Sequence, residues 1–435
     1  MFLDWALHGG GSAAEAGAGL LDSRKVLPSA ELQGKFNKPP SGTLPQRERD
    51  RQNRRRKWEL KFAADDLRKL PLFVPGWAQD HGLDRNKFAS AFACHRRARY
   101  NSEWKIDYIE TYQKAVHHGQ FACGSVWQCP VCAAKIAEKR REELIKAVNN
   151  AKQSGYHVFF LTFTVRHGMG DDIKSILKNM KKSFNSLTSG RWAEKVNKYI
   201  GKVGHVKVLE VTYGKNGWHP HYHVLLFVKC DISVEEIEEL FAEKWIDACI
   251  KNGLPTPERK YACHAQDGTH AEEYVTKWGI VEEMTRGHIK KDNGKTEAGR
   301  TPWQLLEDSS KGDAQASFLF LIYADAFFNA RQLVWSKGLK EKLGVEELSD
   351  QEIVDAEDEA PAKTLIELDD LQIHALVNLR LLCKVLEFAE ELPNDLESYI
   401  AIFTDRYYAE HPEQRKKIVK RMMKRNAKDW SAEGG

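Results

Sequence analysis

The chain has 435 residues, 42% of them hydrophobic, which is enough for a packed core and more than one unit, since a domain takes ~100–200 residues. Its net charge of +4 is only mildly basic, so overall charge does not decide the partner. The N-terminus lacks a secretory signal, and no apolar stretch reaches the ~20 residues that span a membrane. We therefore expect a cytoplasmic protein with no membrane partner, in which the eight cysteines are thiols or metal ligands.

The beginning of the chain is predicted to be a disordered, basic segment over 1–57. Residues 1–45 are rich in Gly, Ala, Ser and Pro without a sustained period. Seven basic residues then fall between 47 and 57, and they either attract phosphates or form the solvated face of a helix. A cysteine-containing region is expected to follow over 58–150.

The central region, 151–290, has the clearest periodicity. It predicts, in chain order, strand 157–165, helix 171–187, strand 205–213, a turn at 214–217, strand 221–228, a helix opening on the capping box Ser233–Glu236, a short strand 260–265 and helix 270–284. This order is the split βαβ pattern of a ferredoxin-like sheet, so we expect an α+β fold with a mostly antiparallel sheet and helices on one face.

The remainder of the chain is predicted to be mainly helical. Residues 315–344 favour a helix within a helical extension over 291–344. Residues 345–360 carry eight acids and no base, which indicates an acidic linker over 345–362. A helical, basic C-terminal region is expected over 363–435.

Three histidines alternate in the stretch "NGWHPHYHVLLFV": His219, His221 and His223. Alternate residues of a strand share one face, so His221 and His223 project together, whereas Pro220 and the turn set His219 aside with an open role. Glu210 lies mid-strand among apolar neighbours, where an unpaired carboxylate is costly. A hairpin that brings Glu210 opposite the histidines predicts a His-His-Glu site for Mn²⁺ or Mg²⁺. The alternative is a surface strand that happens to carry histidines.

Tyr274 and Lys277 stand three residues apart, on one face of the helix expected at 270–284. Tyrosine is a poor nucleophile at its ordinary pKa of ~10. A metal that polarises a phosphodiester, with a lysine nearby to hold the charge, makes it competent. The Y-x-x-K spacing alone is weak, because the chain has 13 tyrosines.

The stretch "CGSVWQCPVC" supplies Cys123, Cys129 and Cys132, and its C-x₂-C end is typical of a zinc-knuckle turn. Cys94 is the preferred fourth ligand of a structural Zn²⁺ site. The histidines at 95, 117 and 118 are alternatives, and free thiols without a metal are the simpler interpretation.

Candidate DNA contacts are of two kinds. Phosphate neutralisation is expected from the polar side of helix 171–187, together with the basic segments 47–57 and 415–425. The lysines of that helix are Lys174, Lys178, Lys181 and Lys182. Trp218 and Tyr222 flank the histidines and are candidates for stacking on bases of an unpaired strand, although core or rim packing is preferred for either one singly.

Three motifs in order resemble the HUH endonucleases, and within them the rolling-circle replication initiator (Rep) proteins of small bacterial plasmids. They are "FLTFTVRH" (160–167), "HPHYHVLLF" (219–227) and "YVTK" (274–277), and "ARQLVWSKGLKEKLG" (330–344) resembles a segment downstream of the nuclease. The likeness covers roughly residues 90–345, and the second motif is the specific one. It implies that 151–290 is an HUH endonuclease domain.

By this resemblance, His221, His223 and Glu210 bind the metal, Lys277 positions metal or phosphate, and Tyr274 attacks the scissile phosphate at the plasmid origin. The cut leaves a 3′-OH primer and a 5′ end held on the tyrosine, and a later transfer rejoins the DNA. Some relatives use a glutamate four residues before the tyrosine for the terminating hydrolysis. That position is His270 here, although Glu273 is close, so the residue that activates water is left open.

The resemblance implies three partners: origin DNA, a host helicase and the replication machinery. The DNA is a duplex or a hairpin with an unpaired nick site. Whether the protein forms an oligomer is left open. Alternatives are a single-tyrosine HUH transposase or relaxase, a catalytically inactive zinc-containing DNA-binding regulator, and a metallo-hydrolase of small molecules. Only the first group would share the need for Tyr274.

Overall fold

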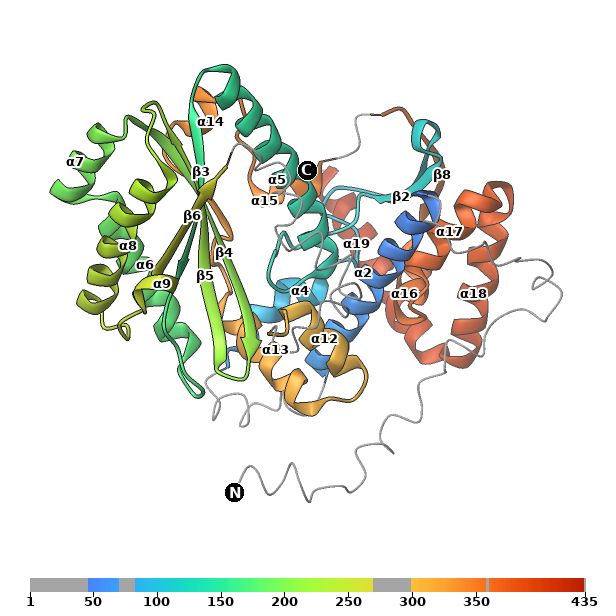
Figure 1. The fold of residues 1–435 in the computed structure, drawn as a ribbon. Helices are drawn as coiled ribbons and strands as arrows, with labels where there is room; N and C mark the ends of the chain where they lie inside the picture. The colour runs from blue at the N-terminus through green and yellow to red at the C-terminus, as the bar shows by residue number, and fades with distance from the viewer. Residues whose placement is uncertain (1–45, 70–82, 269–298, 357–359, 434–435) are drawn as a thin grey trace, which may run out of the picture. The chain divides into compact units, whose positions relative to one another are not determined.

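The computed structural model describes residues 46–69, 83–268, 299–356 and 360–433 (Figure 1). These residues form two compact units. One spans 51–368, and the other contains 369–433 together with 46–50. The fold is mixed α+β with antiparallel sheets and a helical C-terminal region, as expected at this level.

A five-stranded antiparallel sheet dominates the larger unit. Its strand order is β6-β3-β5-β4-β7. The strands are β3 (His157–Thr164), β4 (Lys202–Gly214), β5 (Gly217–Val228), β6 (Cys263–Asp267) and β7 (Leu333–Trp335). The predicted strands at 157–165, 205–213 and 221–228 are thereby confirmed.

The hairpin of β4 and β5 is set by a tight turn at its tip. Gly214 pairs with Gly217, and Gly217 has φ +83°, a conformation that glycine adopts without a steric penalty. A Cβ at Gly217 would also lie 3.0 Å from the carbonyl oxygen of Gly168, in the loop after β3. The turn therefore fixes the register that the rest of β5 follows.

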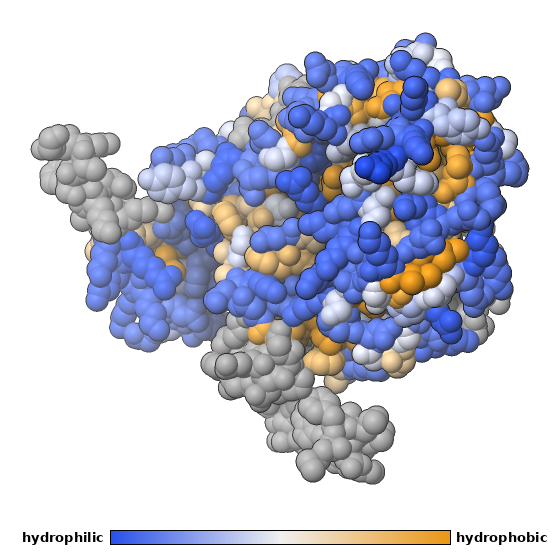
Figure 2. Space-filling model, turned by 90° about the vertical axis from the view of Figure 1, so that its left-hand side faces the viewer, coloured by the Kyte–Doolittle hydropathy of each residue, from blue (hydrophilic) through white to orange (hydrophobic). Residues whose placement is uncertain are grey.

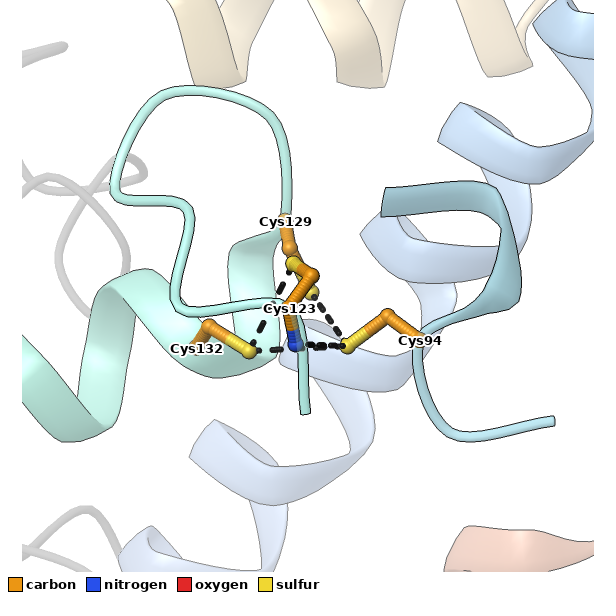
Figure 3. Close-up of side chains that lie close together, drawn as sticks. All are labelled: Cys94, Cys123, Cys129 and Cys132. Atoms are coloured by element: carbon orange, nitrogen blue, oxygen red, sulfur yellow. Dashed lines mark hydrogen bonds between the residues drawn. The ribbon is translucent and has the colours of Figure 1, made fainter. Parts of the chain in front are cut away.

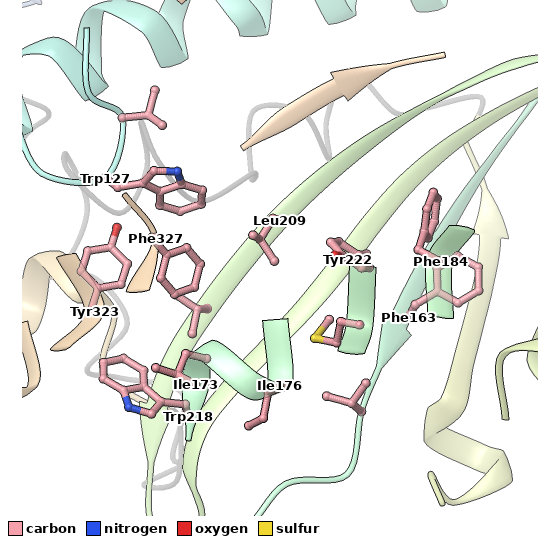
Figure 4. Packing of buried hydrophobic residues seen from close by; sticks show 14 of the residues in the cluster. Trp127, Phe163, Ile173, Ile176, Phe184, Leu209, Trp218, Tyr222, Tyr323 and Phe327 are labelled. Atoms are coloured by element: carbon pink, nitrogen blue, oxygen red, sulfur yellow. The ribbon is translucent and has the colours of Figure 1, made fainter. Parts of the chain in front are cut away.

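Three helices cover one face of this sheet: α6 (Ile173–Thr188), α7 (Gly190–Tyr199) and α8 (Val234–Lys251). The carboxylate of Asp172 accepts from the first amides of α6, and Ser233 accepts from the amide of Glu236 at 3.1 Å, as the sequence predicted for α8. Figure 4 shows Ile173, Ile176 and Phe184 of α6 packed on β-strand residues such as Tyr222.

Helix α5 (Pro130–Gln153) lies on the opposite face, so the sheet has helices on both sides and the prediction of helices on one face only is wrong. Leu144, Val148 and Ala151 pack against the end of the sheet formed by Val158 and Phe227. The other end of this face carries the predicted metal-binding residues. Gly155 follows the helix with φ +72°, in agreement with the predicted C-cap.

A second, three-stranded sheet in the same unit was not predicted. Its order is β2-β1-β8, and its strands are β1 (Trp104–Ile109), β2 (Lys114–His118) and β8 (Ala362–Leu368). Short helices precede it: η4 (Arg85–Phe88) and α4 (Ala89–Ala93), with η5 (Glu110–Tyr112) between β1 and β2. The expectation that residues after 362 are only helical is therefore wrong for β8.

The predicted helix 315–344 is also wrong after Ala326, where α13 (Ala314–Ala326) ends. This helix ends before Asn329, which has φ +59°. Leu333–Trp335 then forms β7 beside Val206–Val208 of β4, because its branched and aromatic side chains suit a sheet edge. Short helices α9 (Arg259–Ala262), α12 (Pro302–Ser310) and α14 (Leu339–Lys342) complete this part.

Two segments expected to lack structure are helical where they are described. Residues 46–57 belong to α2 (Gln46–Lys69), in which Trp58 packs on the rings of His95 and His117. The basic run therefore lies on a docked helix. Within the predicted acidic linker, α15 (Asp350–Asp355) buries Ile353 and Val354.

The smaller unit is helical: α16 (Asp370–Asn378), α17 (Leu382–Glu391), η7 (Pro393–Asp395), α18 (Leu396–Glu410) and α19 (Pro412–Glu433). Ala375, Tyr407 and Tyr408 form a small buried cluster in it. Among the described residues, no helix has the length and apolar character needed to cross a membrane.

Candidate functional site

The hairpin brings Glu210, His221 and His223 to one face of the sheet. In its register Glu210 lies opposite His221, and Val208 lies opposite His223. The Nε2 atoms of the two histidines are 3.0 Å apart, and each is 3.3 Å from Oε2 of Glu210. The three side chains remain partly exposed, so a ligand can reach the donor atoms.

Neighbouring groups orient both imidazoles. Nδ1 of His223 is 3.0 Å from the hydroxyl of Thr162, and the ring stacks on Phe160 at 5.1 Å between centroids. Nδ1 of His221 lies 3.4 Å from the carbonyl oxygen of His219, to which it can donate. The contacts at Nδ1 leave both Nε2 atoms facing the carboxylate: a ring protonated at Nε2 donates to Glu210, and a ring protonated only at Nδ1 offers its Nε2 lone pair to an ion, as metal-binding histidines do.

The donor set fits a divalent cation. Three ligands on adjacent positions of an octahedral ion at ~2.1 Å would be about 3.0 Å apart, and about 3.4 Å apart on a tetrahedral ion. The observed separations of 3.0 and 3.3 Å fall between these two values, so the three donors can share one ion. Burial opposes ionisation of Glu210, but hydrogen bonds from His221 and His223 hold its pKa well below the usual range. The carboxylate is therefore in the form that binds metal.

His219 is separate from this group. Its Nδ1 lies 2.6 Å from Nε2 of His167, whose own Nδ1 is 2.9 Å from the carbonyl oxygen of Asn216. Burial, with the nearby charges of His221 and His167, lowers the pKa of His219 to about 4. His219 is thus a neutral partner of His167 at the tip of the hairpin.

Three of the predicted catalytic residues cannot be placed. Tyr274, Lys277 and Glu273 lie outside the described residues, as does the whole helix expected at 270–284. Their roles stay predictions.

The four predicted cysteines form a second cluster (Figure 3). Cys129 precedes the first turn of α5, Cys132 lies within that turn, Cys123 comes from the loop before it, and Cys94 follows α4. The sulfur of Cys94 is 3.5 Å from that of Cys132 and 3.7 Å from that of Cys129, and Cys123 is 3.8 Å from Cys132. Cys94 therefore completes the set, as preferred from sequence. His95 lies further out, with Nε2 4.0 Å from the sulfur of Cys132.

The cysteine cluster fits a tetrahedral ion. Four sulfurs at ~2.3 Å from one Zn²⁺ would be about 3.8 Å apart, close to the observed separations. The amide of Cys123 donates to the sulfur of Cys94 at 3.2 Å. Burial, together with the neighbouring thiols, raises the pKa of Cys94, whereas hydrogen bonds from those thiols overcome burial and lower the pKa of Cys129. The cluster thus already stabilises one thiolate, the form that binds metal.

The prediction that Trp218 and Tyr222 stack on bases is wrong. Both rings are buried, with 6% and 3% of their surface exposed, and both belong to the core under the helices. They alternate with the histidines along β5 and therefore face the other side of the sheet. Figure 4 shows Trp218 beside Tyr323 in that core.

The predicted lysines of α6 are all exposed. Lys174 forms an ion pair with the buried Asp325 at 2.5 Å, so part of its charge is neutralised within the protein. Lys178, Lys181 and Lys182 remain candidates for phosphate contacts.

The larger unit therefore combines an antiparallel sheet that carries a His-His-Glu group on one face with a separate four-cysteine cluster, and each of the two groups could hold a metal ion. The replication-protein family Rep_1 matches residues 114–370, more than half of the chain. The chain belongs to this family, which confirms the resemblance to replication initiator proteins.

Two of the three similar proteins compared next are named as Rep proteins. A segment of 137 residues is 36% identical to "Protein rep" of Streptomyces lividans, covering 25% of this chain and 30% of that protein. Another of 124 residues is 32% identical to "Protein rep" of Staphylococcus aureus, covering 27% and 51%. A third is 30% identical over 139 residues to a "Neomycin resistance protein" of Streptomyces cyanogenus, covering 26% and 32%. The chain thus spans between about a third and a half of these relatives, and no solved structure matches.

Some residues of the site were missed from sequence. Thr162 and Phe160, which orient His223, lie on β3, and His167, which pairs with His219, follows that strand. For Phe160 and Thr162 the signal was present in the first motif, 160–167, because even-numbered residues of a strand share one face. Finding their partners required the pairing of β3 with β5, which places Thr162 opposite His223.

Proposed function

We propose that this protein initiates rolling-circle replication of a plasmid by nicking one strand at the origin, as an HUH endonuclease. The observation that carries the proposal is the convergence of Glu210, His221 and His223 within 3.0–3.3 Å, in a chain of the replication-protein family. The strand order β6-β3-β5-β4, with α6 and α8 on one face, agrees with a ferredoxin-like sheet of the HUH type.

In this proposal Glu210, His221 and His223 hold Mn²⁺ or Mg²⁺, which would polarise the scissile phosphate. The Oη atom of Tyr274 gives up its proton and attacks the phosphorus, the bond to O3′ breaks, and the departing oxygen takes up one proton to become the 3′-OH primer. The 5′ end stays on the tyrosine as a phosphodiester, which conserves the energy of the broken bond for later rejoining. Lys277 stabilises the charge on the phosphate.

Cys94, Cys123, Cys129 and Cys132 hold a structural Zn²⁺ in the same proposal. Three features support it: the sulfur separations, the burial of Cys94, Cys129 and Cys132, and the position of two ligands at the start of α5. The ion would fix the loop 123–129 to α4 and α5. Origin DNA, a host helicase and self-association are proposed partners.

The test is a Tyr274→Phe protein incubated with Mn²⁺ and a supercoiled plasmid carrying the DNA that surrounds the gene. The wild-type protein should convert the plasmid to the open circle and remain covalently attached to the 5′ end, whereas the variant should do neither. If the wild-type protein nicks nothing, or the variant nicks equally well, the proposal fails. Nicking that survives Tyr274→Phe but needs His223 would instead favour a metal-dependent hydrolase.

A further inference from the structure

A pocket with about 80 Å³ of accessible space lies beside the cysteine cluster, between β2, the start of α5 and the end of α15. It is on the α5 side of the larger unit, away from α7 and α8, where hydrophilic surface surrounds scattered apolar patches (Figure 2). A single water molecule needs only about 10–15 Å³ of such space, so the pocket has room for a small ligand such as a tetrahedral oxyanion. The proposed nicking chemistry makes no use of this pocket.

The lining of the pocket is rich in nitrogen donors. Among the described residues, five basic side chains contribute to it, and Asp355 supplies its one carboxylate. The basic residues are His95, Arg99, His117, His118 and Lys135. His95 and His117 are buried, whereas Arg99 is partly exposed and Lys135 is exposed. The imidazoles therefore lie toward the floor of the pocket, and the two longer cations lie toward its mouth.

The C-terminal end of α15 brings the two cations of the mouth together. The Nζ atom of Lys135 donates to the carbonyl oxygens of Val354 and Ala356, at 3.3 and 2.6 Å. The Nη1 atom of Arg99 lies 3.4 Å from the carbonyl oxygen of Asp355, the residue between them. Because Cα atoms of consecutive residues are about 3.8 Å apart, both charged groups reach the same end of the pocket.

The guanidinium of Arg99 is held loosely. Its contacts with the carboxylate and the carbonyl oxygen of Asp355 measure 3.5 and 3.4 Å. By comparison, the guanidinium of Arg140 lies 2.7 Å from the carboxylate of Asp350, at the start of the same helix. Asp355 also accepts a hydrogen bond from the Gln351 side-chain amide at 2.9 Å. Since a guanidinium carries five N–H donors, Arg99 keeps donors that the oxygens of an anion can use.

Two imidazoles of the lining offer further nitrogen atoms. Nδ1 of His95 is buried without a hydrogen-bond partner among the described residues, although a buried polar atom normally has one. Nε2 of the same ring faces the sulfur of Cys132 at 4.0 Å, so Nδ1 lies on the side of the ring away from the cysteine. His118 is oriented by Asp107, whose carboxylate is 2.6 Å from Nδ1, which leaves Nε2 of His118 for a ligand.

We propose that this pocket binds a phosphate group, with Arg99 and Lys135 at the mouth and the imidazoles of His95 and His118 at the floor. Two cations against one carboxylate give the lining a net positive charge, and a guanidinium matches two phosphate oxygens at once. The phosphate belongs to the backbone of bound DNA, or it is free inorganic phosphate. The inference rests on the proposed function only where the phosphate is that of DNA, and nicking plays no part in it.

The test compares three variants of the full-length protein. Arg99→Met/Lys135→Met removes the two cations of the mouth, together with their bonds to α15. Val131→Phe enlarges a partly exposed side chain of the lining and leaves every charged group in place, so it fills the pocket without changing its charge. Arg331→Met/Lys337→Met is the matched control, because it removes one arginine and one lysine from exposed positions on either side of β7.

Each variant is made in the Tyr274→Phe background, so that binding is measured without cleavage. Thermal unfolding with and without inorganic phosphate measures binding of the free ion, because a ligand that binds the folded state raises the Tm. Fluorescence anisotropy with labelled duplex and single-stranded DNA gives Kd over a series of salt concentrations. The circular dichroism spectrum without phosphate checks that each variant is folded.

Phosphate should raise the Tm of the parent and of the control equally, and it should raise that of neither pocket variant. If the phosphate is that of DNA, both pocket variants should also bind DNA about 10-fold more weakly, and the salt slope of the double variant on duplex DNA should fall by about 0.9, the value for one lost phosphate contact. The control should keep its DNA affinity to within about 2-fold. A lost phosphate response with unchanged DNA affinity would support the site and assign it to free phosphate.

Two results would overturn the proposal, whether or not the wild-type protein nicks. One is equal phosphate response and equal DNA affinity in the double variant and the control. The other is a Val131→Phe protein that keeps both properties of the parent, because the charges would then act without the pocket.

Discussion

The two metal-binding candidates of this protein are built in opposite ways. Glu210, His221 and His223 come from two paired strands, keep partial exposure and offer three donors, which leaves coordination positions for water or phosphate oxygens. The cysteine cluster draws on two loops and a helix start and offers four sulfurs, three of them buried, which fill a tetrahedral ion.

The difference shows how the local fold decides the kind of site. A strand register fixes side chains at regular intervals on a stiff surface, which suits a site that must hold its geometry while a substrate enters. Loops bend around an ion until every position is filled, which suits a site whose contribution is to stability. The experiments below are expected to separate an open site from a closed one.

The largest effect is expected from Cys132→Ser. The variant should lose its zinc and its cooperative unfolding transition, with the free energy of unfolding lowered by more than about 3 kcal/mol, because structural zinc binding contributes directly to folding. Zinc content and thermal unfolding followed by circular dichroism measure this. Cys249→Ser, at a buried cysteine outside the cluster, should retain its zinc. An unchanged Tm in Cys132→Ser would show that the cluster is not a stabilising centre.

Glu210→Gln should lower nicking by ~100-fold or more, since it removes a direct metal ligand, and even indirect supports of metal sites cost 10–100-fold. Stability should change little. Glu238→Gln is the matched control, because Glu238 also faces an imidazole, His264 at 3.0 Å, but away from the site. Nicking assays across Mn²⁺ concentrations would reveal the loss. Equal activity of the two variants would remove Glu210 from the metal site.

Brief treatment with a chelator should distinguish the sites without mutation. The open site should release its ion within minutes and lose nicking activity, which added Mn²⁺ restores, while the buried cysteines keep zinc and the circular dichroism spectrum stays unchanged. Elemental analysis before and after treatment provides the measurement. If activity returned only with added Zn²⁺, the assignment of the two metals would need to be reversed.

The smallest effect is expected from His219→Ala, compared with His223→Ala. Because His219 bonds to His167 and contributes only its carbonyl oxygen to His221, its loss should weaken Mn²⁺ binding by less than ~10-fold, well below the effect of His223→Ala. Titration with Mn²⁺ followed by electron paramagnetic resonance would measure both. Equal losses would make His219 a ligand.

The hairpin and its site could be predicted from sequence because each depends on neighbours along the chain. The turn signal at 214–217 sets the register, and the register alone brings Glu210 to His221. The same alternation also predicts that Trp218 and Tyr222 lie on the other face of the strand, because residues at even positions cannot share a face with the odd-numbered histidines.

The missed elements depend on distant pairing. Strand β1 pairs with β8, and Trp104 is the register partner of Leu368. A periodicity in the local sequence cannot identify a partner strand so far along the chain. Strand β7 has only three residues, too few to show an alternating pattern. The helical pattern of the preceding α13 was stronger, so the predicted helix was extended across β7. Sequence patterns therefore predicted the core of the site better than the sheets that surround it.

Strand β7 also covers an edge of the five-stranded sheet. The outer edge of the 13-residue strand β4 is covered by β7 at Val206–Val208, by the carbonyl of Gln332, which accepts from the amide of Leu209, and by Arg300, which exchanges two backbone hydrogen bonds with Tyr213. Without them, a long β-strand would offer unpaired amides and carbonyls to any other chain. A fragment that ends after β6 would keep the histidines but expose this edge, and we expect it to aggregate edge to edge. Residues 300–336 therefore protect the sheet from pairing with other chains.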